Sequence, residues 1–220
     1  MFDRSTVFLD LETTGASASH DRITEIGMLE VERGRLVGEW STLVNPEAPI
    51  PPAIEALTGI SNEMVRDAPT FADLAGELLE RLEGRLLVAH NARFDYGFLR
   101  NEFRRLGIRY QSPVLCTVKL SRRLYPAHHR HNLDSLIERH GIICSGRHRA
   151  LGDARVLWEF VQKSSAEVGA AVMDRALEDL LRAPATPPGL GPEVMDDVPE
   201  GPGVYVFYGD NEVPLYVGKG

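Results

Sequence analysis

Residues 5–15, STVFLDLETTG, decide the fold of this chain. The first half is apolar and rich in β-branched residues, which is typical of a strand buried in a sheet. The strand ends in two carboxylates, Asp10 and Glu12, and a TTG turn follows. Side chains two positions apart in a strand point to the same face, so we expect both carboxylates on one face. Burying them side by side is costly without cations, so the stretch predicts a metal site or a strand end open to water.

The segments that follow predict how the sheet begins. Residues 22–32 and 35–45 read as two strands joined by a tight turn at Arg33 and Gly34, which predicts a hairpin and therefore three antiparallel strands in succession. A proline-rich connection at 45–61 holds at most a short helix. Apolar residues at helical spacing then predict a helix over 70–82.

The second half of the main domain predicts alternating strands and helices. The apolar run at 85–90, RLLVAH, is typical of a strand buried on both faces. The other expected elements are a helix at 92–106, a strand at 114–118, helical segments at 119–125 and 133–139, and a long helix from 150 to 181 with a break at Gly169. The order βββαβαβα predicts an α/β fold, with helices flanking a mixed five-stranded sheet.

A change in composition divides the chain. Residues 183–202 concentrate proline and glycine and break every periodicity, so we expect a linker after a domain at 1–182. Residues 203–208 and 214–220 read as two strands around a turn at 209–211. Two strands are too few to fold alone, so 203–220 is expected to be the truncated start of a second domain.

Bulk composition fits a globular chain without a membrane partner. Hydrophobic residues make up 43%, charged residues 25%, and the mean hydropathy is −0.17; no apolar run approaches the ~18 residues of a membrane span. Charged residues near the N-terminus, Asp3 and Arg4 among them, exclude the apolar core of a signal peptide. Cys116 and Cys144 form no CxxC pair, which fits a structural role in a reducing, cytoplasmic compartment.

The charge is distributed unevenly. The whole chain carries 24 Lys and Arg against 32 Asp and Glu, a net charge of −8. Residues 85–149 alone hold 13 basic against 4 acidic residues, or +9, which leaves 11 against 28, or −17, for the rest. This asymmetry indicates a local phosphate-binding face on an acidic body, or helix faces that are merely solvated.

Three further residues complete a candidate site with the pair on the first strand. Asp95 follows the strand at 85–90, in the first turn of the next helix, where the helix dipole favours a carboxylate. If that strand lies beside the first, Asp95 arrives next to Asp10. Asp153 is expected in the first turn of the helix that begins near residue 150, and His148 precedes it. Hard oxygen ligands suit Mg²⁺ or Mn²⁺, while an imidazole, with an ordinary pKa of ~6.5, suits accepting a proton from water.

In this order and spacing, Asp10-x-Glu12, Asp95 and His148-x4-Asp153 resemble the DEDDh exonucleases, which have an RNase H-like fold. More narrowly, they resemble the epsilon-type (DnaQ-like) proofreading subunit of bacterial DNA polymerase III. The likeness covers residues 1–182 and includes the stretches ETTG, ITEIG, LVNP, LTGIS and HNLDSL. It implies a 3′–5′ exonuclease that releases nucleoside 5′-monophosphates from single-stranded or frayed DNA ends, in proofreading or repair.

The resemblance also implies a role for each catalytic residue. Asp10, Glu12, Asp95 and Asp153 would hold two divalent cations, Mg²⁺ or Mn²⁺, ~3.5–4 Å apart, with Asp10 touching both. One ion orients a water whose proton passes to His148, and the other stabilises the leaving 3′-oxygen.

Contacts to the nucleic acid follow from the same resemblance. Thr13 and Asn91 would line the site of the 3′-terminal nucleotide, beside His148. Asp134 is expected to organise the fold rather than to bind metal.

The end of the chain carries a second resemblance. Gly203-Val204-Tyr205 and Tyr216-Val217-Gly218 are similar to the opening of a GIY-YIG nuclease, as in the UvrC-type excision-repair endonuclease. That family also needs an arginine and a metal-binding glutamate further on, which the sequence up to Gly220 does not supply. We therefore expect this fragment to be inactive as it stands.

Two other functions stay open at this point. An exoribonuclease would trim RNA with the same residues, because nothing in the sequence reads a 2′-hydroxyl recognisably. A non-catalytic nucleic-acid-binding module of a polymerase or repair assembly is the alternative of a different class, and the intact set of five residues argues against it.

Overall fold

The computed structural model of the protein describes residues 4–144, 146–182, 203–209 and 213–219. The chain falls into two compact units that divide after Arg182. Within the described ranges, no helix combines the length and the apolar character that crossing a membrane would require.

The first unit is built on a mixed five-stranded sheet. Strand β1 (Thr6–Thr13) lies antiparallel to β2 (Ile23–Glu32), which in turn lies antiparallel to β3 (Arg35–Leu43). On the other side of β1, β4 (Leu86–Ala89) and β5 (Val114–Cys116) continue the sheet in parallel. The order β3-β2-β1-β4-β5 places β1 in the centre, and it confirms the predicted mixed sheet with β4 beside β1.

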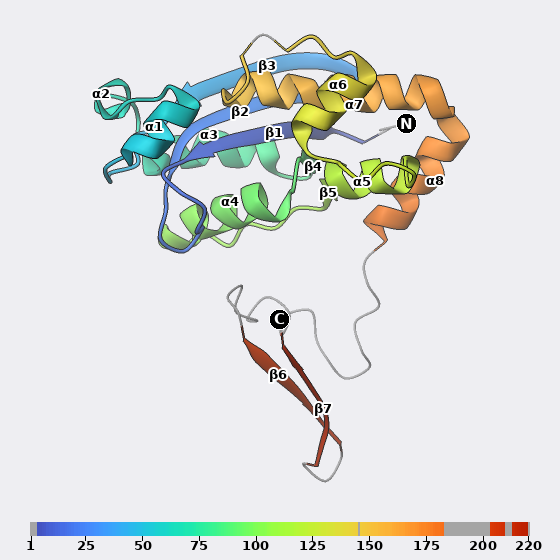
Figure 1. The fold of residues 1–220 in the computed structure, drawn as a ribbon. Helices are drawn as coiled ribbons and strands as arrows, with labels where there is room; N and C mark the ends of the chain where they lie inside the picture. Colours follow the sequence, from blue (N-terminus) through green and yellow to red (C-terminus); the bar gives the residue numbers. More distant parts are fainter. Residues whose placement is uncertain (1–3, 145, 183–202, 210–212, 220) are drawn as a thin grey trace. The chain divides into compact units, whose positions relative to one another are not determined.

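Helices cover both faces of this sheet (Figure 1). The helices of this unit are α1 (Pro52–Thr58), α2 (Asn62–Val65), α3 (Phe71–Leu82), α4 (Arg93–Arg105), α5 (Thr117–Leu124), α6 (Leu133–His140), α7 (Ala150–Val168) and α8 (Ala170–Leu181), of which α1 and α2 lie at one end of the sheet. Alternate residues of β1 enter different cores: Val7 and Leu9 pack with residues of α3 and α4, whereas Phe8 packs with residues of α6, α7 and α8. Burial on both faces explains why the strand is almost continuously apolar.

Local sequence explains where several helices begin and end. Helix α3 begins at Phe71 because Thr70 and Asp73 form a capping box. The predicted break at Gly169 is confirmed, since this residue separates α7 from α8. The strand predicted at 114–118 is shorter than expected. It ends at Cys116, because Thr117 begins α5 and its hydroxyl donates to the carbonyl of Ala89.

The second unit contains a β-hairpin. Strand β6 (Val204–Tyr208) pairs antiparallel with β7 (Pro214–Lys219), as the sequence predicts. The expected linker at 183–202 and the turn residues 210 and 211 lie outside the described residues.

Candidate active site and metal centre

Three carboxylates meet at the end of the central strand. Asp10 and Glu12 come from β1, and Asp153 comes from the first turn of α7. Each offers a ligand oxygen, and these oxygens lie within 4.8 Å of one another. Asp10 and Glu12 are partly exposed, whereas Asp153 is buried. The two carboxylates of one strand and the carboxylate of a helix 143 positions after Asp10 therefore form one cluster.

A glycine on the neighbouring strand allows α7 to come this close. Gly27 of β2 lies opposite Asp10 in the sheet register. A Cβ at Gly27 would lie 2.2 Å from the backbone nitrogen of Leu151 and 2.3 Å from the carbonyl carbon of Ala150. The start of α7 thus rests directly on the backbone of β2, and Asp153 arrives beside the β1 carboxylates.

Asp95 reaches the site from the other side of β1. It lies in the first turn of α4, which follows β4, and it is only 2% exposed. Its carboxyl group is hydrogen-bonded to the backbone of Leu11, and its charge acts on Asp10. The arrangement agrees with the expectation that a β4 strand beside β1 brings Asp95 to Asp10.

The four carboxyl groups hold protons more tightly than ordinary acids. Loss of hydration on burial is the main cause for all four, and neighbouring carboxylates add to it for Asp10, Glu12 and Asp95. The pKa of Asp95 rises to about 8 and that of Glu12 to about 7. The pKa of Asp10 rises well above its usual range, and that of Asp153 is also raised although Arg147 opposes the shift. A bound cation would offset both the repulsion between these carboxylates and the loss of their hydration.

The donor atoms fit a hard metal ion. The buried Oδ1 of Asp153 has no hydrogen-bond partner within the described part of the chain. A buried carboxylate oxygen normally has a partner, so this atom has capacity for one more ligand. All the candidate ligands are carboxylate oxygens, which suit Mg²⁺ or Mn²⁺ better than soft metals. The residues present therefore support metal binding, without specifying the ion.

His148 lies next to this cluster on the segment that enters α7. Its backbone N–H donates to Oδ2 of Asp153 at 3.3 Å, and its side chain is partly exposed. The φ of His148 is +60°, in the left-handed region that a non-glycine residue seldom adopts. Such a conformation at a candidate proton acceptor is a frequent sign of a functional site.

The sequence reasoning missed Arg147, the residue before His148. Its guanidinium forms an ion pair with Asp153 and a 2.9 Å hydrogen bond from Nε to Oδ1 of Asp134. Asp134 thus anchors an arginine at the edge of the site, in keeping with its expected organising role. The sequence Arg147-His148-Arg149 carries the signal, because two arginines flank the candidate proton acceptor.

The candidate nucleotide contacts occupy two different settings. Thr13, at the end of β1, is buried, and its hydroxyl donates to the carbonyl of Gly15 at 2.6 Å. Asn91 follows β4, is exposed, and has a positive φ of 56°. The contacts of Thr13 and Asn91 with a nucleotide remain predictions.

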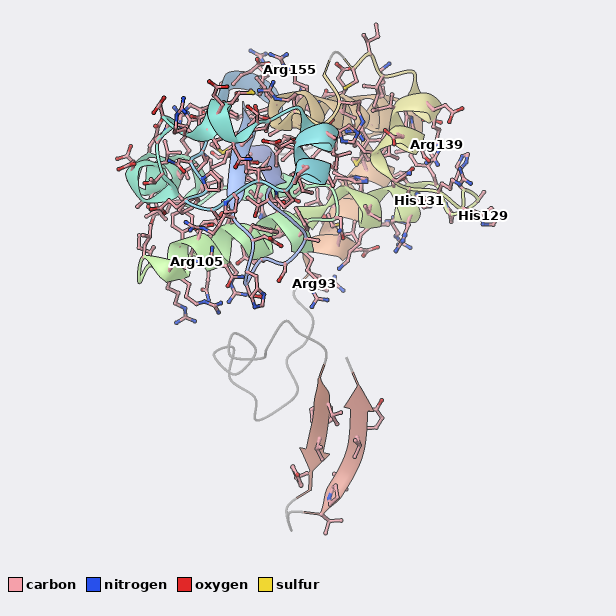
Figure 2. All side chains as sticks on the ribbon, turned by 60° about the vertical axis from the view of Figure 1, so that its left-hand side comes forward. Arg93, Arg105, His129, His131, Arg139 and Arg155 are labelled. Carbon is pink, nitrogen blue, oxygen red and sulfur yellow. The ribbon has the colours of Figure 1, made fainter. Side chains whose placement is uncertain are left out.

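The basic middle segment is less free than its sequence suggests. At least five of its thirteen basic residues form ion pairs with acidic residues: Arg85, Arg105, Arg123, Arg147 and Arg149. His131 is buried and uses both ring nitrogens, on Ser121 Oγ and on the carbonyl of His128. Exposed His129 lies near it at one end of the unit, together with Arg139 (Figure 2). A phosphate-binding face would therefore be smaller than the charge count implies.

Comparison with known proteins agrees with this geometry. The chain is 37% identical over 183 residues to a PolC-type DNA polymerase III of Caldanaerobacter subterraneus, covering 78% of this chain and 13% of that protein. It is 38% identical to a putative bifunctional exonuclease/endonuclease protein of Mycobacterium tuberculosis, covering 96% of this chain and 35% of the relative. The chain thus spans about an eighth and about a third of these two relatives.

A solved structure and a family model extend the comparison. Exonuclease X in complex with 5′ overhanging duplex DNA superposes with a TM-score of 0.62 at 27% identity, covering 78% of this chain and 98% of that one. The family model described as Exonuclease matches residues 7–161, which include all five candidate catalytic residues. These matches neither name an epsilon-type subunit nor extend the family assignment to the C-terminal hairpin. Since the model covers well over half of the sequence, the chain belongs to the Exonuclease family.

Proposed function

We propose that this protein is a divalent-metal-dependent 3′–5′ exonuclease that removes nucleoside 5′-monophosphates from single-stranded or frayed DNA ends. The observation that carries the proposal is the cluster of Asp10, Glu12 and Asp153, whose oxygens lie within 4.8 Å of one another. Asp95 adds a fourth carboxylate, itself buried, to the same place. A protein gains nothing in stability from four such groups, so their arrangement favours a catalytic use.

Asp10, Glu12, Asp95 and Asp153 would hold two divalent cations, Mg²⁺ or Mn²⁺. Such ions, when bound, neutralise charge on the phosphate and make a water molecule more acidic. In this proposal His148 accepts the proton of that water, because its segment is tied by its backbone N–H to Asp153. Thr13 and Asn91 line the place of the terminal nucleotide.

The substrate in this proposal is DNA, acted on at its 3′ end. Support comes from two similar proteins, a PolC-type DNA polymerase III and an exonuclease X in complex with DNA. We include in the proposal the narrower resemblance to an epsilon-type proofreading subunit, with a polymerase or repair assembly as partner. We propose a cytoplasmic location for the protein, because its proposed substrate is DNA. The free thiols of Cys116 and Cys144 agree with this location.

The decisive experiment compares two polymers of equal sequence. Single-stranded DNA and RNA, each labelled at the 5′ end, are incubated with the protein in Mg²⁺ or in EDTA. We expect stepwise shortening of DNA from the 3′ end in Mg²⁺ only, and no shortening by Asp10→Ala. Asp67→Ala is the matched control, because Asp67 is an exposed carboxylate before α3.

Each alternative predicts a different result in this assay. Faster shortening of RNA than of DNA would identify an exoribonuclease. DNA binding without cleavage by the wild-type chain would identify a non-catalytic module. Cleavage in EDTA, or full activity of Asp10→Ala, would reject the metal-dependent mechanism.

A second pair of substrates tests the proofreading role. A primer whose last nucleotide is mismatched frays more readily than a paired one, and a proofreading enzyme acts on the frayed strand. We expect faster excision of the mismatched nucleotide. Equal rates on both primers would favour a general end-processing role in repair.

We further propose that residues 203–220 begin a GIY-YIG nuclease domain, separated by a linker at 183–202 from the exonuclease domain at 1–182. The hairpin of β6 and β7 carries Tyr205 and Tyr216, the positions that match the motif. The Mycobacterium tuberculosis relative that covers 96% of this chain, a putative bifunctional exonuclease/endonuclease protein, supports this assignment.

A closed circular DNA separates the two nuclease activities, because it offers no end to an exonuclease. We expect the 220-residue chain to leave it intact. A polypeptide that continues past Gly220 with the missing arginine and glutamate should nick it, and Tyr216→Phe should reduce nicking. Absence of nicking by the extended polypeptide would reject the GIY-YIG assignment.

A further inference from the structure

The residue proposed to accept the proton sits in a conformation that its surroundings must impose. His148 has a φ of +60°. A non-glycine residue persists there only where neighbouring contacts fix the backbone. The residues on both sides of His148 are arginines, and both are anchored by carboxylates on other elements.

The anchor after His148 lies on the sheet. Nη2 of Arg149 donates to Oε1 of Glu25 at 2.6 Å, and its Nε donates to both carboxylate oxygens at 3.1 Å. The N–H of Ala150, the first residue of α7, donates to Oε2 of Glu25 at 2.9 Å. Glu25 belongs to β2 and is 3% exposed. A forked arginine–carboxylate pair has little angular freedom, so β2 fixes the position of Arg149.

The anchor before His148 is different in kind. Arg147 binds Asp134 of α6 and also Asp153, a proposed metal ligand. A change at Arg147 would therefore disturb the cation site directly. The pair of Glu25 and Arg149 contains no proposed metal ligand, so it offers the cleaner test of how His148 is held.

We propose that Glu25 is a positioning residue for His148: through Arg149 and the first amide of α7, it holds the strained backbone from which the imidazole projects. The inference rests on the proposed function, because it assumes that His148 acts on the attacking water. Glu25 itself does not contact the reacting atoms in this proposal. Its contribution is to keep the imidazole at a fixed distance from the carboxylate cluster, and a displacement of about 1 Å is enough to cost about 10²-fold in rate.

The first test measures Glu25→Gln, which keeps the size of the side chain but removes its charge. We expect kcat on 3′-ended single-stranded DNA in Mg²⁺ to fall by about 10²-fold. KM for the DNA should stay within about twofold of wild type. A raised KM with unchanged kcat would overturn the proposal.

Glu39→Gln is the matched control. Glu39 of β3 pairs with Arg155 of α7, so this pair also joins the long helix to the sheet. Figure 2 labels Arg155 at the top of the view. Glu39→Gln should leave kcat unchanged, and a fall equal to that of Glu25→Gln would mean that any loosening of α7 has the same effect and would overturn the specific role of Glu25.

A double-mutant cycle with His148→Ala separates positioning from a general structural role. If Glu25 acts through His148, Glu25→Gln should lower kcat by less than about twofold once the imidazole is absent. A further fall of about 10²-fold in the His148→Ala background would overturn the proposal.

Arg149→Lys tests the same contact if Glu25→Gln does not fold. Lysine keeps the charge but cannot form the forked pair, so the same fall in kcat and the same dependence on His148 are expected. Unchanged kcat in a folded Arg149→Lys protein would overturn the inference while leaving the proposed function intact. A wild-type chain without exonuclease activity would overturn the proposed function, and this inference with it.

Discussion

Two glutamates on neighbouring strands of the sheet have opposite electrostatic surroundings. Glu12 of β1 and Glu25 of β2 are partners in the sheet register. Glu25 receives the guanidinium of Arg149 and the N–H of Ala150. Glu12 lies instead among the carboxylates of the cluster, and its pKa rises to about 7 because burial, Asp153 and Glu25 all disfavour its ionised form.

The difference separates a carboxylate that joins two elements from one that we propose to be a metal ligand. A buried charge with several donors around it holds two elements together, and removing its partner is costly. Glu102 is a second example, since it is 2% exposed and pairs with Arg22 and Arg105. In the cluster around Asp10, Arg147 pairs with Asp153 but does not offset the raised pKa values of the other carboxyl groups, so we expect the cluster to lower stability unless cations bind there.

The largest effect is expected for Asp10→Asn. Loss of the carboxylate proposed to touch both cations should lower exonuclease activity by about 10³-fold or more. The same change replaces a carboxyl group whose ionisation the cluster disfavours by a neutral amide, so the Tm of the metal-free protein should rise. Glu25→Gln should lower Tm, because it weakens a satisfied pair. A thermal scan in EDTA checks the signs, and a fall of Tm in Asp10→Asn would contradict the contrast between the two carboxylates.

Gly27→Ala should displace the start of α7 without changing any charged side chain. The added methyl group would meet the backbone of α7 at Leu151. The helix start must move, and overpacking of this kind costs about 1–3 kcal/mol of stability. Displacing Asp153 and His148 should lower activity by about 10²-fold. Gly76→Ala, on α3 with open space around its Cβ, is the control and should retain activity.

Divalent cations should stabilise the protein in a pH-dependent way. The raised pKa values mean that the folded chain holds protons which the unfolded chain releases above about pH 4. Without metal, this contribution to stability is therefore complete below about pH 4 and is lost as pH rises through about 7 for Glu12 and about 8 for Asp95. Cations bind the ionised form and reverse the loss.

The measurement is Tm with and without Mg²⁺ or Mn²⁺ at two pH values. At ~100-fold excess over Kd the ion should add about 2.7 kcal/mol at pH 8, or about 5–10 °C in Tm. At pH 5.5, where protons compete, the shift should be much smaller. Equal shifts at both pH values would show that the ion binds elsewhere, and Asp10→Asn should lose most of the shift.

Local sequence was sufficient to predict the strands and the carboxylates they carry. The apolar run before Asp10 and Glu12 encodes both the strand and its exposed end, and the glycine at 169 encodes a helix break. The strand end that the sequence predicts at residue 118 lies beyond the observed end of β5 at Cys116. Its limit depends on the hydroxyl of Thr117, which bonds to Ala89 on the next strand rather than to a sequence neighbour.

Long-range ion pairs explain what sequence reasoning missed. Arg149 and Glu25 are 124 positions apart, and only the packing of α7 on β2 makes them partners. Counting charges along residues 85–149 treats such arginines as free for phosphate, whereas Arg149 and Arg85 are already paired with acids of β2. Charge patterns in a sequence therefore overestimate a binding face whenever the fold brings acids from another segment to it.

The smallest predicted effect concerns the strained backbone of His148, which Glu25 is proposed to hold. Glycine adopts a positive φ without a steric penalty, so His148→Gly should be more stable than His148→Ala by about 1 kcal/mol, although both lack the imidazole. Glu47, with a φ of 52°, provides the control for the same comparison away from the site.

If part of the pairing energy of Glu25 offsets the backbone strain at residue 148, a protein with glycine at this position, which has no such strain, should depend less on Glu25. Glu25→Gln should then destabilise the His148→Gly protein less than it destabilises the His148→Ala protein, as measured by urea denaturation. Equal destabilisation in both backgrounds would show that the pair of Glu25 and Arg149 anchors α7 without acting on the backbone of His148.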